Sequence, residues 1–285
     1  MNILITGSRG FIGNYFINEY SSNYKINTFS FVKENLDNLN LEVTELVLHL
    51  SALVHQMGGA SASEYERVNV TQTLELAKRA KESGVKHFIF MSSVKVYGEE
   101  TDRVYTETTP CHPEDDYGKS KLRAEEELLK LQSEEFQVSI VRTPIVYGYG
   151  VKANIKSLVN LVKKISILPF GNINNKRSMV YIGNLAHLVN ELIQEKKQGV
   201  FLAADDTSVS TSEFIKIIAE NLNKRIYLIE LPFFETLLKF FKPSFHKRLY
   251  GSLEVNNDFT KKELNLQNPF STKEGIRKML YGDDR

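Results

Sequence analysis

A tyrosine and a lysine four residues apart carry the clearest chemical signal in this chain. Tyr117 and Lys121 lie in a stretch that reads as a helix, residues 117–131, so their spacing places them on one helix face. The pKa of tyrosine is about 10, and a nearby ammonium lowers it by favouring the phenolate. Such a tyrosine can exchange a proton with an alcohol or carbonyl oxygen while hydride moves at the adjacent carbon. The lysine can also hold the ribose of a cofactor.

Two serine hydroxyls are expected at the end of the strand that precedes this helix. Residues 85–93 form an apolar run that ends in Ser92 and Ser93. Doubly wound sheets bind ligands at the carboxyl ends of their strands, so a hydroxyl placed there is a candidate for the chemistry. Serines also end many strands that have no such role. The combination with Tyr117 and Lys121 is what favours a functional serine.

The elements that must position these groups begin at the N-terminus. Residues 1–6 read as a buried strand, residues 14–20 as the helix that follows, and Gly7, Gly10 and Gly13 lie at the turn between them. This order is typical of a dinucleotide-binding site. In such a site Gly7 permits the tight turn, Gly10 lets the backbone approach a pyrophosphate, and Gly13 lets the helix pack on the strand. The helix N-terminus then attracts the phosphates. The alternative is a plain strand-to-helix turn.

The second expected strand, residues 25–31, bears on the choice between NAD and NADP. In NAD-binding folds an acid usually ends this strand and binds the ribose hydroxyls, but Ser30 occupies that position. Arg9 lies in the glycine loop and Lys33 follows the strand, near the place of a 2′-phosphate. The missing acid and the two cations favour NADP(H), with NAD(H) as the alternative. Both cations can also be read as solvated surface charges.

Further apolar runs predict the rest of a parallel sheet. Strands are expected at residues 46–52, 137–143 and 199–203, and helices at 65–83 and 153–165. The stretch between the second and third strands is short for a full strand-helix-strand passage, so we expect this part of the sheet to be reduced. The prediction is an α/β fold, a doubly wound parallel-sheet Rossmann fold with a smaller, mainly helical C-terminal substrate domain. The Rossmann domain would comprise residues 1–143 with 178–205, and the nucleotide-sugar-binding domain residues 144–177 and 206–285.

Three polar residues each have two interpretations. Asn69 in helix 65–83 would bond to backbone beside the central strands, or it would lie on an exposed helix face. Lys176 and Arg177 lie near a domain junction, where paired cations suit the diphosphate of a second nucleotide. They can equally be solvated surface residues.

The segment of residues 231–243, LPFFETLLKFFKP, is unusually apolar for its surroundings. It would touch a membrane or a partner, or it would form a buried helix or a lid over the substrate. The buried helix or lid is favoured, because the rest of the chain carries no membrane signal.

The composition excludes several classes of protein. The 285 residues, 42% hydrophobic and 25% charged, are typical of a globular chain with one large or two closely packed domains. A net charge of +1 predicts no nucleic-acid partner and no membrane surface. No signal segment and no apolar run of about 20 residues is present, so we expect a cytoplasmic protein. Cys111 is the only cysteine, which excludes an intramolecular disulfide and a multi-cysteine metal site, and no metal is expected.

Taken in order, these motifs resemble the extended short-chain dehydrogenase/reductase family, also called the NAD-dependent epimerase/dehydratase family. The matching stretches span most of the chain and are residues 7–13, 49–52, 92–98, 117–121 and 142–148. The resemblance implies that Tyr117 is the acid–base residue and Lys121 its partner. By the spacing from residues 96–98, it also implies that Ser93 rather than Ser92 binds the reacting oxygen.

The same resemblance implies contacts to the cofactor and the substrate. The expected cofactor-binding residues are Gly7, Ser8, Arg9, Gly10, Phe11, Ile12, Gly13, Ser30, Leu50, Ser51, Ala52, Tyr117 and Lys121. Ser93, Asn154 and Arg177 are the expected substrate contacts, with Arg177 on the diphosphate of a UDP-linked sugar. Relatives usually pair through the two long helices, so a homodimer is expected.

Residues 150–154 and 172–178 are similar to bacterial surface-polysaccharide enzymes of the 4-keto reductase and epimerase branch. The leading hypothesis is therefore NADPH-dependent reduction of the C4 keto group of a UDP-linked 4-keto-6-deoxy-N-acetylhexose. The alternatives are an NAD-dependent nucleotide-sugar 4-epimerase and a non-catalytic NADP-binding regulator, which the intact serine, tyrosine and lysine disfavour. A dehydratase is disfavoured because Val94 and Lys95 stand where dehydratases place an Asp-Glu pair.

Overall fold

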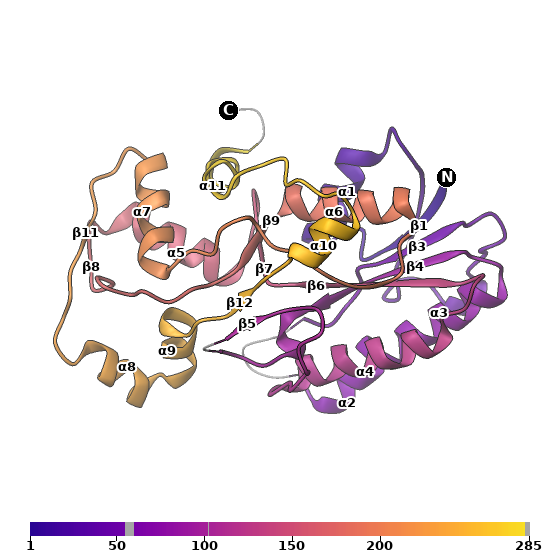
Figure 1. The fold of residues 1–285 in the computed structure, drawn as a ribbon, viewed down its shortest axis with the longest axis horizontal. Helices are drawn as coiled ribbons and strands as arrows, with labels where there is room; N and C mark the ends of the chain where they lie inside the picture. Colours follow the sequence, from indigo (N-terminus) through magenta and orange to yellow (C-terminus); the bar gives the residue numbers. More distant parts are fainter. Residues whose placement is uncertain (55–59, 102, 283–285) are drawn as a thin grey trace.

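The computed structural model describes residues 1–54, 60–101 and 103–282. A six-stranded parallel sheet forms its centre, in the order β10-β6-β4-β3-β1-β2 (Figure 1). Along the chain these strands are β1 (Asn2–Thr6), β2 (Lys25–Phe29), β3 (Leu46–His49), β4 (His87–Ser93), β6 (Gln137–Thr143) and β10 (Gly199–Leu202). The strand order reverses between β1 and β3, and doubly wound sheets bind their ligands at such a point.

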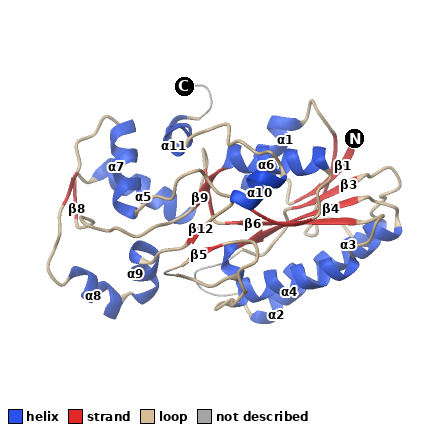
Figure 2. Ribbon diagram, in the orientation of Figure 1, coloured by secondary structure: helices blue, strands red, loops and turns tan. Residues whose placement is uncertain are grey.

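Helices cover both faces of this sheet (Figures 1 and 2). On one face lie α1 (Phe11–Tyr20) and α6 (Ile182–Glu195), where Ile3 and Ile5 of β1 pack against helix residues such as Phe16. On the other face lie α3 (Gln72–Glu82) and α4 (Asp116–Leu131), which share a core with Leu4. Successive strand residues point to opposite faces, so one apolar strand supplies both cores. The predicted doubly wound parallel fold is confirmed.

The C-terminal part is mainly helical, as predicted. Its helices are α5 (Ala153–Lys164), α7 (Thr211–Asn221), α8 (Phe234–Phe241), α9 (Pro243–Tyr250), α10 (Asp258–Glu263) and α11 (Thr272–Tyr281). Three two-stranded sheets accompany them: β7 (Ile145–Tyr147) with β9 (Met179–Tyr181), β8 (Ile167–Leu168) with β11 (Tyr227–Leu228), and β5 (Val104–Tyr105) with β12 (Glu254–Val255). A second apolar core joins α5, α7 and α11 through residues such as Val162, Phe214 and Ile276. The exact domain boundaries remain a prediction.

The helix predicted at residues 65–83 is assembled from three segments. These are α2 (Ala62–Tyr65), a π-helical segment (Glu66–Thr71) and α3. Asn69 is buried in the π-helical segment. Its amide donates to the Leu53 carbonyl over 3.0 Å, and its side-chain oxygen accepts from the Leu53 N–H over 2.8 Å. The predicted backbone contact of Asn69 is thus confirmed. A single 3-10 turn (Leu36–Asn38) lies between β2 and β3. This agrees with the prediction that this part of the sheet is reduced.

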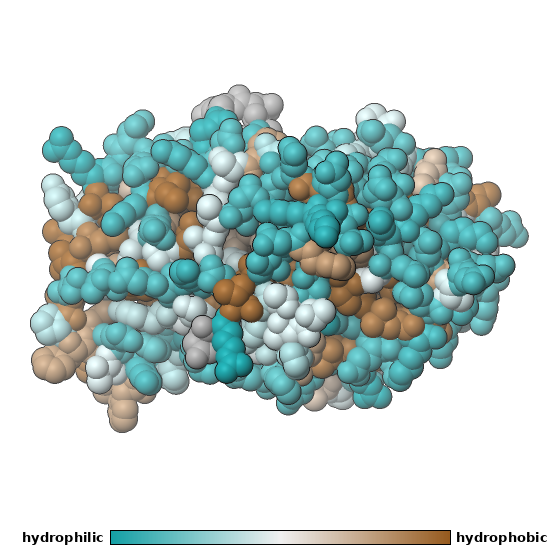
Figure 3. All heavy atoms as spheres, viewed as in Figure 1, coloured by the Kyte–Doolittle hydropathy of each residue, from teal (hydrophilic) through white to brown (hydrophobic). Residues whose placement is uncertain are grey.

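The prediction that residues 231–243 form a buried helix is wrong. α8 does form in this segment, but none of its residues is buried. Phe234 and Leu238 pack against the second core, whereas Phe233 and Phe240 are 79% and 81% exposed. The reason is that the core covers one edge of the broad apolar face of this helix. Figure 3 shows pale brown, apolar atoms at the lower left of the molecule, where Figure 1 places α8.

No helix among the described residues combines the length and apolar character that crossing a membrane requires.

Candidate active site

The glycine loop forms a tight turn between β1 and α1. Gly7 has a φ of +68°, and a Cβ at this position would lie 2.8 Å from the backbone of Leu50 and Ser51. A Cβ at Gly13 would lie 2.5 Å from the carbonyl oxygen of Gly7. The loop is therefore packed backbone against backbone, at the point where the strand order reverses. This shape exposes the N–H groups at the start of α1 to phosphates, and it fits the expected NAD(P).

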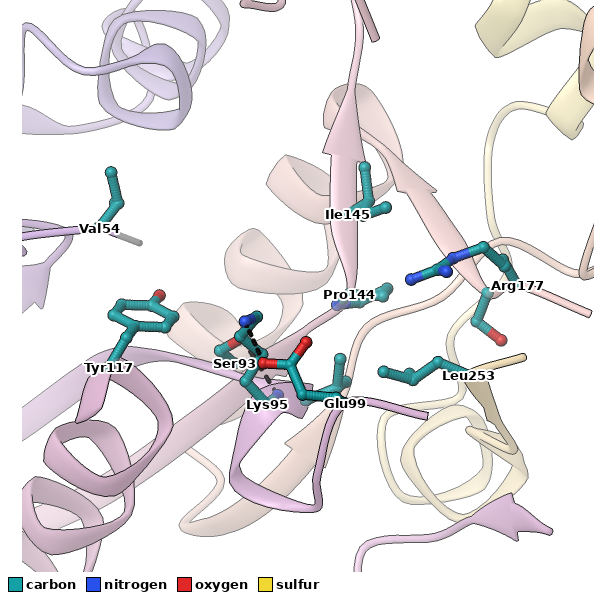
Figure 4. Close-up of a pocket in the computed structure, with 11 residues that line it drawn as sticks. Val54, Ser93, Lys95, Glu99, Tyr117, Pro144, Ile145, Arg177 and Leu253 are labelled. Carbon is teal, nitrogen blue, oxygen red and sulfur yellow. Dashed lines mark hydrogen bonds and ion pairs between the residues drawn. The ribbon is translucent and has the colours of Figure 1, made fainter. Parts of the chain in front are cut away.

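The end of β4 and the first turn of α4 open into one cavity of about 250 Å³. Ser93 and Tyr117 lie on one side of this cavity, and Arg177 lies across from them (Figure 4). The other labelled residues of the wall are Val54, Lys95, Glu99, Pro144, Ile145 and Leu253. We call this the catalytic cavity, because it brings a hydroxyl, a phenol and a guanidinium to one space.

The two serines at the end of β4 point to different surroundings. Ser93 lines the catalytic cavity, and its Oγ accepts a hydrogen bond from the Lys95 N–H over 3.3 Å. Ser92 is buried and donates to the carboxylate of Glu125. Successive strand side chains alternate between faces, so only one of the two can reach the cavity. The structure brings Ser93 beside Tyr117.

Tyr117 is set in place by the cap of α4. The Asp115 side chain accepts from the Gly118 N–H over 2.7 Å and so starts the helix one residue before Tyr117. Burial raises the pKa of Tyr117 to about 12, and a hydrogen bond with Ser93 acts in the opposite direction. The predicted lowering of this pKa by Lys121 is absent, because the Lys121 ammonium donates instead to the Met91 carbonyl over 2.8 Å.

Lys121 is buried beside the central strands β3 and β4. Its Nζ lies 4.4 Å from the centre of the Phe90 ring. Burial lowers the pKa of this lysine to about 7, and the nearby carboxylate of Glu125 opposes that shift. Burial lowers the pKa of His49 to about 3, and the charge of Lys121 adds to that shift. The Lys121 ammonium therefore lies against β4, one helical turn along α4 from Tyr117, and its two predicted roles stay predictions.

A buried ion pair supports the site, and sequence reasoning missed it. Arg142 of β6 contacts Glu125 of α4 over 2.6 Å, and both side chains are almost fully buried. Arg142 also donates to the Tyr97 hydroxyl over 2.7 Å. The Glu125 carboxylate also accepts a hydrogen bond from the Ser92 hydroxyl of β4. The ion pair therefore connects β4 and β6 to α4. Glu125 lies four residues after Lys121, which itself lies four residues after Tyr117. This spacing on one helix could have indicated a third polar residue on the same inward face.

An ammonium occupies the position at which dehydratases carry an acid. Lys95 contacts Glu99 over 2.5 Å and Asp115 over 2.6 Å. Because Asp115 is the cap of α4, this contact also holds the turn after Ser93 against the helix that carries Tyr117. Two carboxylates therefore neutralise the charge of Lys95.

A second cavity of about 380 Å³ adjoins the first and shares Arg177 and Ile145 with it. We call it the apolar cavity, since most of its lining is aliphatic or aromatic; Asn154 of α5 contributes an amide. The Arg177 guanidinium donates to the carbonyls of Arg248 and Gly251 over 3.1 and 3.0 Å. Lys176 lies on the surface, 3.7 Å from a Glu254 oxygen, so Arg177 alone of the two cations faces the cavities.

The end of β2 holds an acid that its sequence position does not reveal. A turn after this strand brings the Glu34 carboxylate back to accept from the Ser30 N–H over 2.9 Å. The Ser30 carbonyl accepts from the N–H groups of both Lys33 and Glu34. A carboxylate thus stands beside Ser30, where NAD-binding folds place an acid. This carboxylate weakens the sequence argument for NADP, which rests on the missing acid together with Arg9 and Lys33, and the preference for NADP over NAD stays a prediction.

The model of the NAD dependent epimerase/dehydratase family matches residues 3–204. The chain belongs to this family. It is 38% identical to a UDP-glucose 4-epimerase of Vibrio cholerae over 308 residues, which cover 97% of this chain and 93% of that protein. The predicted family is confirmed, and the chain is an NAD(P)-dependent enzyme of the epimerase type.

Solved structures show the same fold. MoeE5 in complex with UDP-glucose and NAD matches with a TM-score of 0.75 at 22% identity, over 98% of this chain and 97% of that one. RMD from Pseudomonas aeruginosa, complexed with NADPH, matches with a TM-score of 0.78 at 19% identity, over 99% and 98%. One of these structures holds NAD and the other NADPH, so the shared fold alone does not fix the choice of dinucleotide.

Proposed function

We propose that this protein is an NAD-dependent 4-epimerase of UDP-linked hexoses. The observation that carries the proposal is the placement of Arg177 between the two cavities. A hexose in the catalytic cavity would reach Ser93 and Tyr117, its diphosphate would meet the Arg177 guanidinium, and the uridine would occupy the apolar cavity beside Asn154. The similarity to the Vibrio cholerae enzyme over nearly the whole chain supports this assignment.

The proposed reaction oxidises C4 of the sugar and then reduces the same carbon from the other face. The bound dinucleotide supplies the hydride acceptor and donor. Tyr117 takes the proton of the C4 hydroxyl in the first half and returns it in the second, and Ser93 bonds the same oxygen. Burial favours the neutral phenol, which suits the reduction. For the oxidation Tyr117 must accept the proton as the phenolate, and the hydrogen bond with Ser93 favours that form.

The carboxylate at the end of β2 makes cofactor choice testable. We expect Glu34→Lys to shift the ratio of NADH to NADPH affinity roughly fivefold toward NADPH, since a repulsion of about 1 kcal/mol between the carboxylate and a 2′-phosphate disappears. Titration of each dinucleotide by fluorescence measures the ratio. Glu42→Lys, at an exposed acid of the same connection, is the matched control. An unchanged ratio in Glu34→Lys would show that this carboxylate does not select the cofactor.

The 4-keto reductase is the second candidate. Arg9 is exposed on the glycine loop, where it is free to meet a 2′-phosphate, and residues 150–154 and 172–178 resemble those of such reductases. The same Ser93 and Tyr117 would then act once, in the reducing direction, with NADPH consumed.

One experiment distinguishes the two candidates. The purified protein is incubated with UDP-glucose or UDP-N-acetylglucosamine and NAD, and the C4 configuration is followed by proton NMR. A mixture of both C4 epimers, reached from either side without net cofactor consumption, is the expected result. Stoichiometric loss of NADPH with a UDP-4-keto-6-deoxy-N-acetylhexose, and no epimer from either UDP-sugar, would replace the epimerase by the reductase.

A further inference from the structure

An exposed apolar stripe on α8 has no role in the proposed reaction. Phe233, Leu237 and Phe240 are 79%, 53% and 81% exposed. The three-residue spacing of Leu237 and Phe240 places them on one side of the helix, and Phe233 is the residue directly before it. Phe241, 72% exposed, extends the same side and contacts Phe240 with ring centres 5.2 Å apart. Soluble surfaces rarely gather large apolar side chains in this way, and such patches mark interaction sites.

The stripe is separate from the core contacts of the same helix. Phe234 and Leu238 hold α8 to the second core, and the Phe234 ring lies 6.3 Å from the ring of Phe170. The stripe residues contribute nothing to the lining of either cavity. The helix is therefore attached along one edge and presents the rest of its apolar face outward, at the lower left of the molecule in Figures 1 and 3.

The charges around the stripe are mainly positive. Residues 234–250 carry four cations, Lys239, Lys242, Lys247 and Arg248, and one acid, Glu235. That acid already contacts His246 over 3.2 Å. Lys247 pairs with Glu100 and Glu114 over 3.8 and 3.6 Å. Lys239 and Lys242 are exposed and form no ion pair with any residue of the described ranges. This local excess of positive charge contrasts with the net charge of +1 of the whole chain.

A second copy of the chain fits this surface poorly. A stable protein interface buries about 800 Å² on each partner, whereas α8, with its 8 residues, is about 12 Å long. A two-fold contact through the stripe would also bring the cations of one helix toward those of the other. An anionic surface that also accepts apolar side chains would bind both the apolar stripe and the cations beside it.

We propose that α8 docks the protein on an anionic lipid bilayer. Phe233, Leu237, Phe240 and Phe241 enter the boundary between headgroups and acyl chains, and Lys239 and Lys242 pair with anionic headgroups. An amphipathic helix of Phe, Leu and Lys that lies in the membrane plane binds in this way. The proposal adds a membrane location to the enzyme and does not depend on which C4 reaction it catalyses.

Vesicle flotation of the full-length protein tests the proposal. With vesicles of phosphatidylcholine and phosphatidylglycerol we expect the protein to float, and with phosphatidylcholine alone we expect much weaker binding. Phe240→Ser/Phe241→Ser should lower the bound fraction at least roughly tenfold. Lys239→Glu/Lys242→Glu should abolish the preference for the anionic vesicles. The matched control is Val43→Ser/Val104→Ser, at two valines that are 63% and 48% exposed on other parts of the chain.

Turnover of a soluble substrate and the thermal unfolding midpoint show whether each variant is folded. Both should be unchanged in Phe240→Ser/Phe241→Ser, because these side chains touch neither cavity. Failure of the wild-type protein to float, or equal flotation of wild type and Phe240→Ser/Phe241→Ser, would overturn the proposal. So would a dimer in light scattering that this double variant dissociates, since the stripe would then bind a second copy.

Discussion

Tyr117→Phe should lower kcat by at least about a hundredfold, the usual scale for loss of a general acid–base group. The phenol is the proton donor and acceptor that the catalytic cavity offers next to Ser93. The ring packing is kept in the variant, including the contact with the Tyr65 ring at 6.1 Å. Steady-state kinetics on a UDP-hexose measure the effect, and affinity for the dinucleotide should change little.

Tyr65→Phe is the matched control for this prediction. It removes a phenol hydroxyl from the ring that faces Tyr117, but Tyr65 does not line the catalytic cavity. We expect a change in kcat of less than about tenfold, because no proton transfer is lost. Equal losses in the two variants would mean that Tyr117 acts through packing and that its assignment as the acid–base residue is wrong.

Glu125→Ala should destabilise the protein by about 3–5 kcal/mol, the usual cost of breaking a buried ion pair. The variant leaves Arg142 buried, with the partner of its shortest contact removed. It also removes the acceptor of the Ser92 hydroxyl. Chemical denaturation followed by circular dichroism measures the loss in the free energy of unfolding. Because the carboxylate joins β4, β6 and α4, the remaining folded enzyme should also have a lower kcat.

Glu127→Ala on the same helix provides the comparison. Glu127 pairs with Lys130 over 2.6 Å, but that lysine side chain is 68% exposed. Exposed ion pairs contribute little to stability because water and salt screen them, so this variant should unfold at nearly the wild-type denaturant concentration. If Glu125→Ala cost no more than Glu127→Ala, the ion pair would have no special part in holding the site together.

The doubly wound parallel sheet could be predicted because local patterns and general rules agree there. Apolar runs such as Ile3–Ile5 and the glycines after them indicate buried parallel strands and a turn, whatever the rest of the chain does. The spacing of Tyr117 and Lys121 predicts a shared helix face for the same local reason. Ser93 and Tyr117 come together because parallel strands and the helices that follow them present their functional ends at one edge.

The features that were missed depend on contacts between distant residues or on tertiary packing. The carboxylate beside Ser30 comes from a turn that returns Glu34 to the end of β2. The exposure of α8 depends on how much of its apolar face the second core covers, and periodicity alone carries no information on that. The pKa of Tyr117 depends on burial and on where the Lys121 ammonium points, whereas spacing on a helix shows only that the two residues share a face.

The most direct measurement uses a UDP-hexose that carries deuterium at C4. The substrate is incubated with the enzyme in ordinary water, and the C4 epimer is analysed by NMR and mass spectrometry. We predict that the epimer forms without added reductant and retains deuterium at C4, because the hydrogen leaves and returns to the same carbon within the site. An epimer with solvent hydrogen at C4, or no epimer at all from a folded and cofactor-binding protein, would contradict the proposed 4-epimerase.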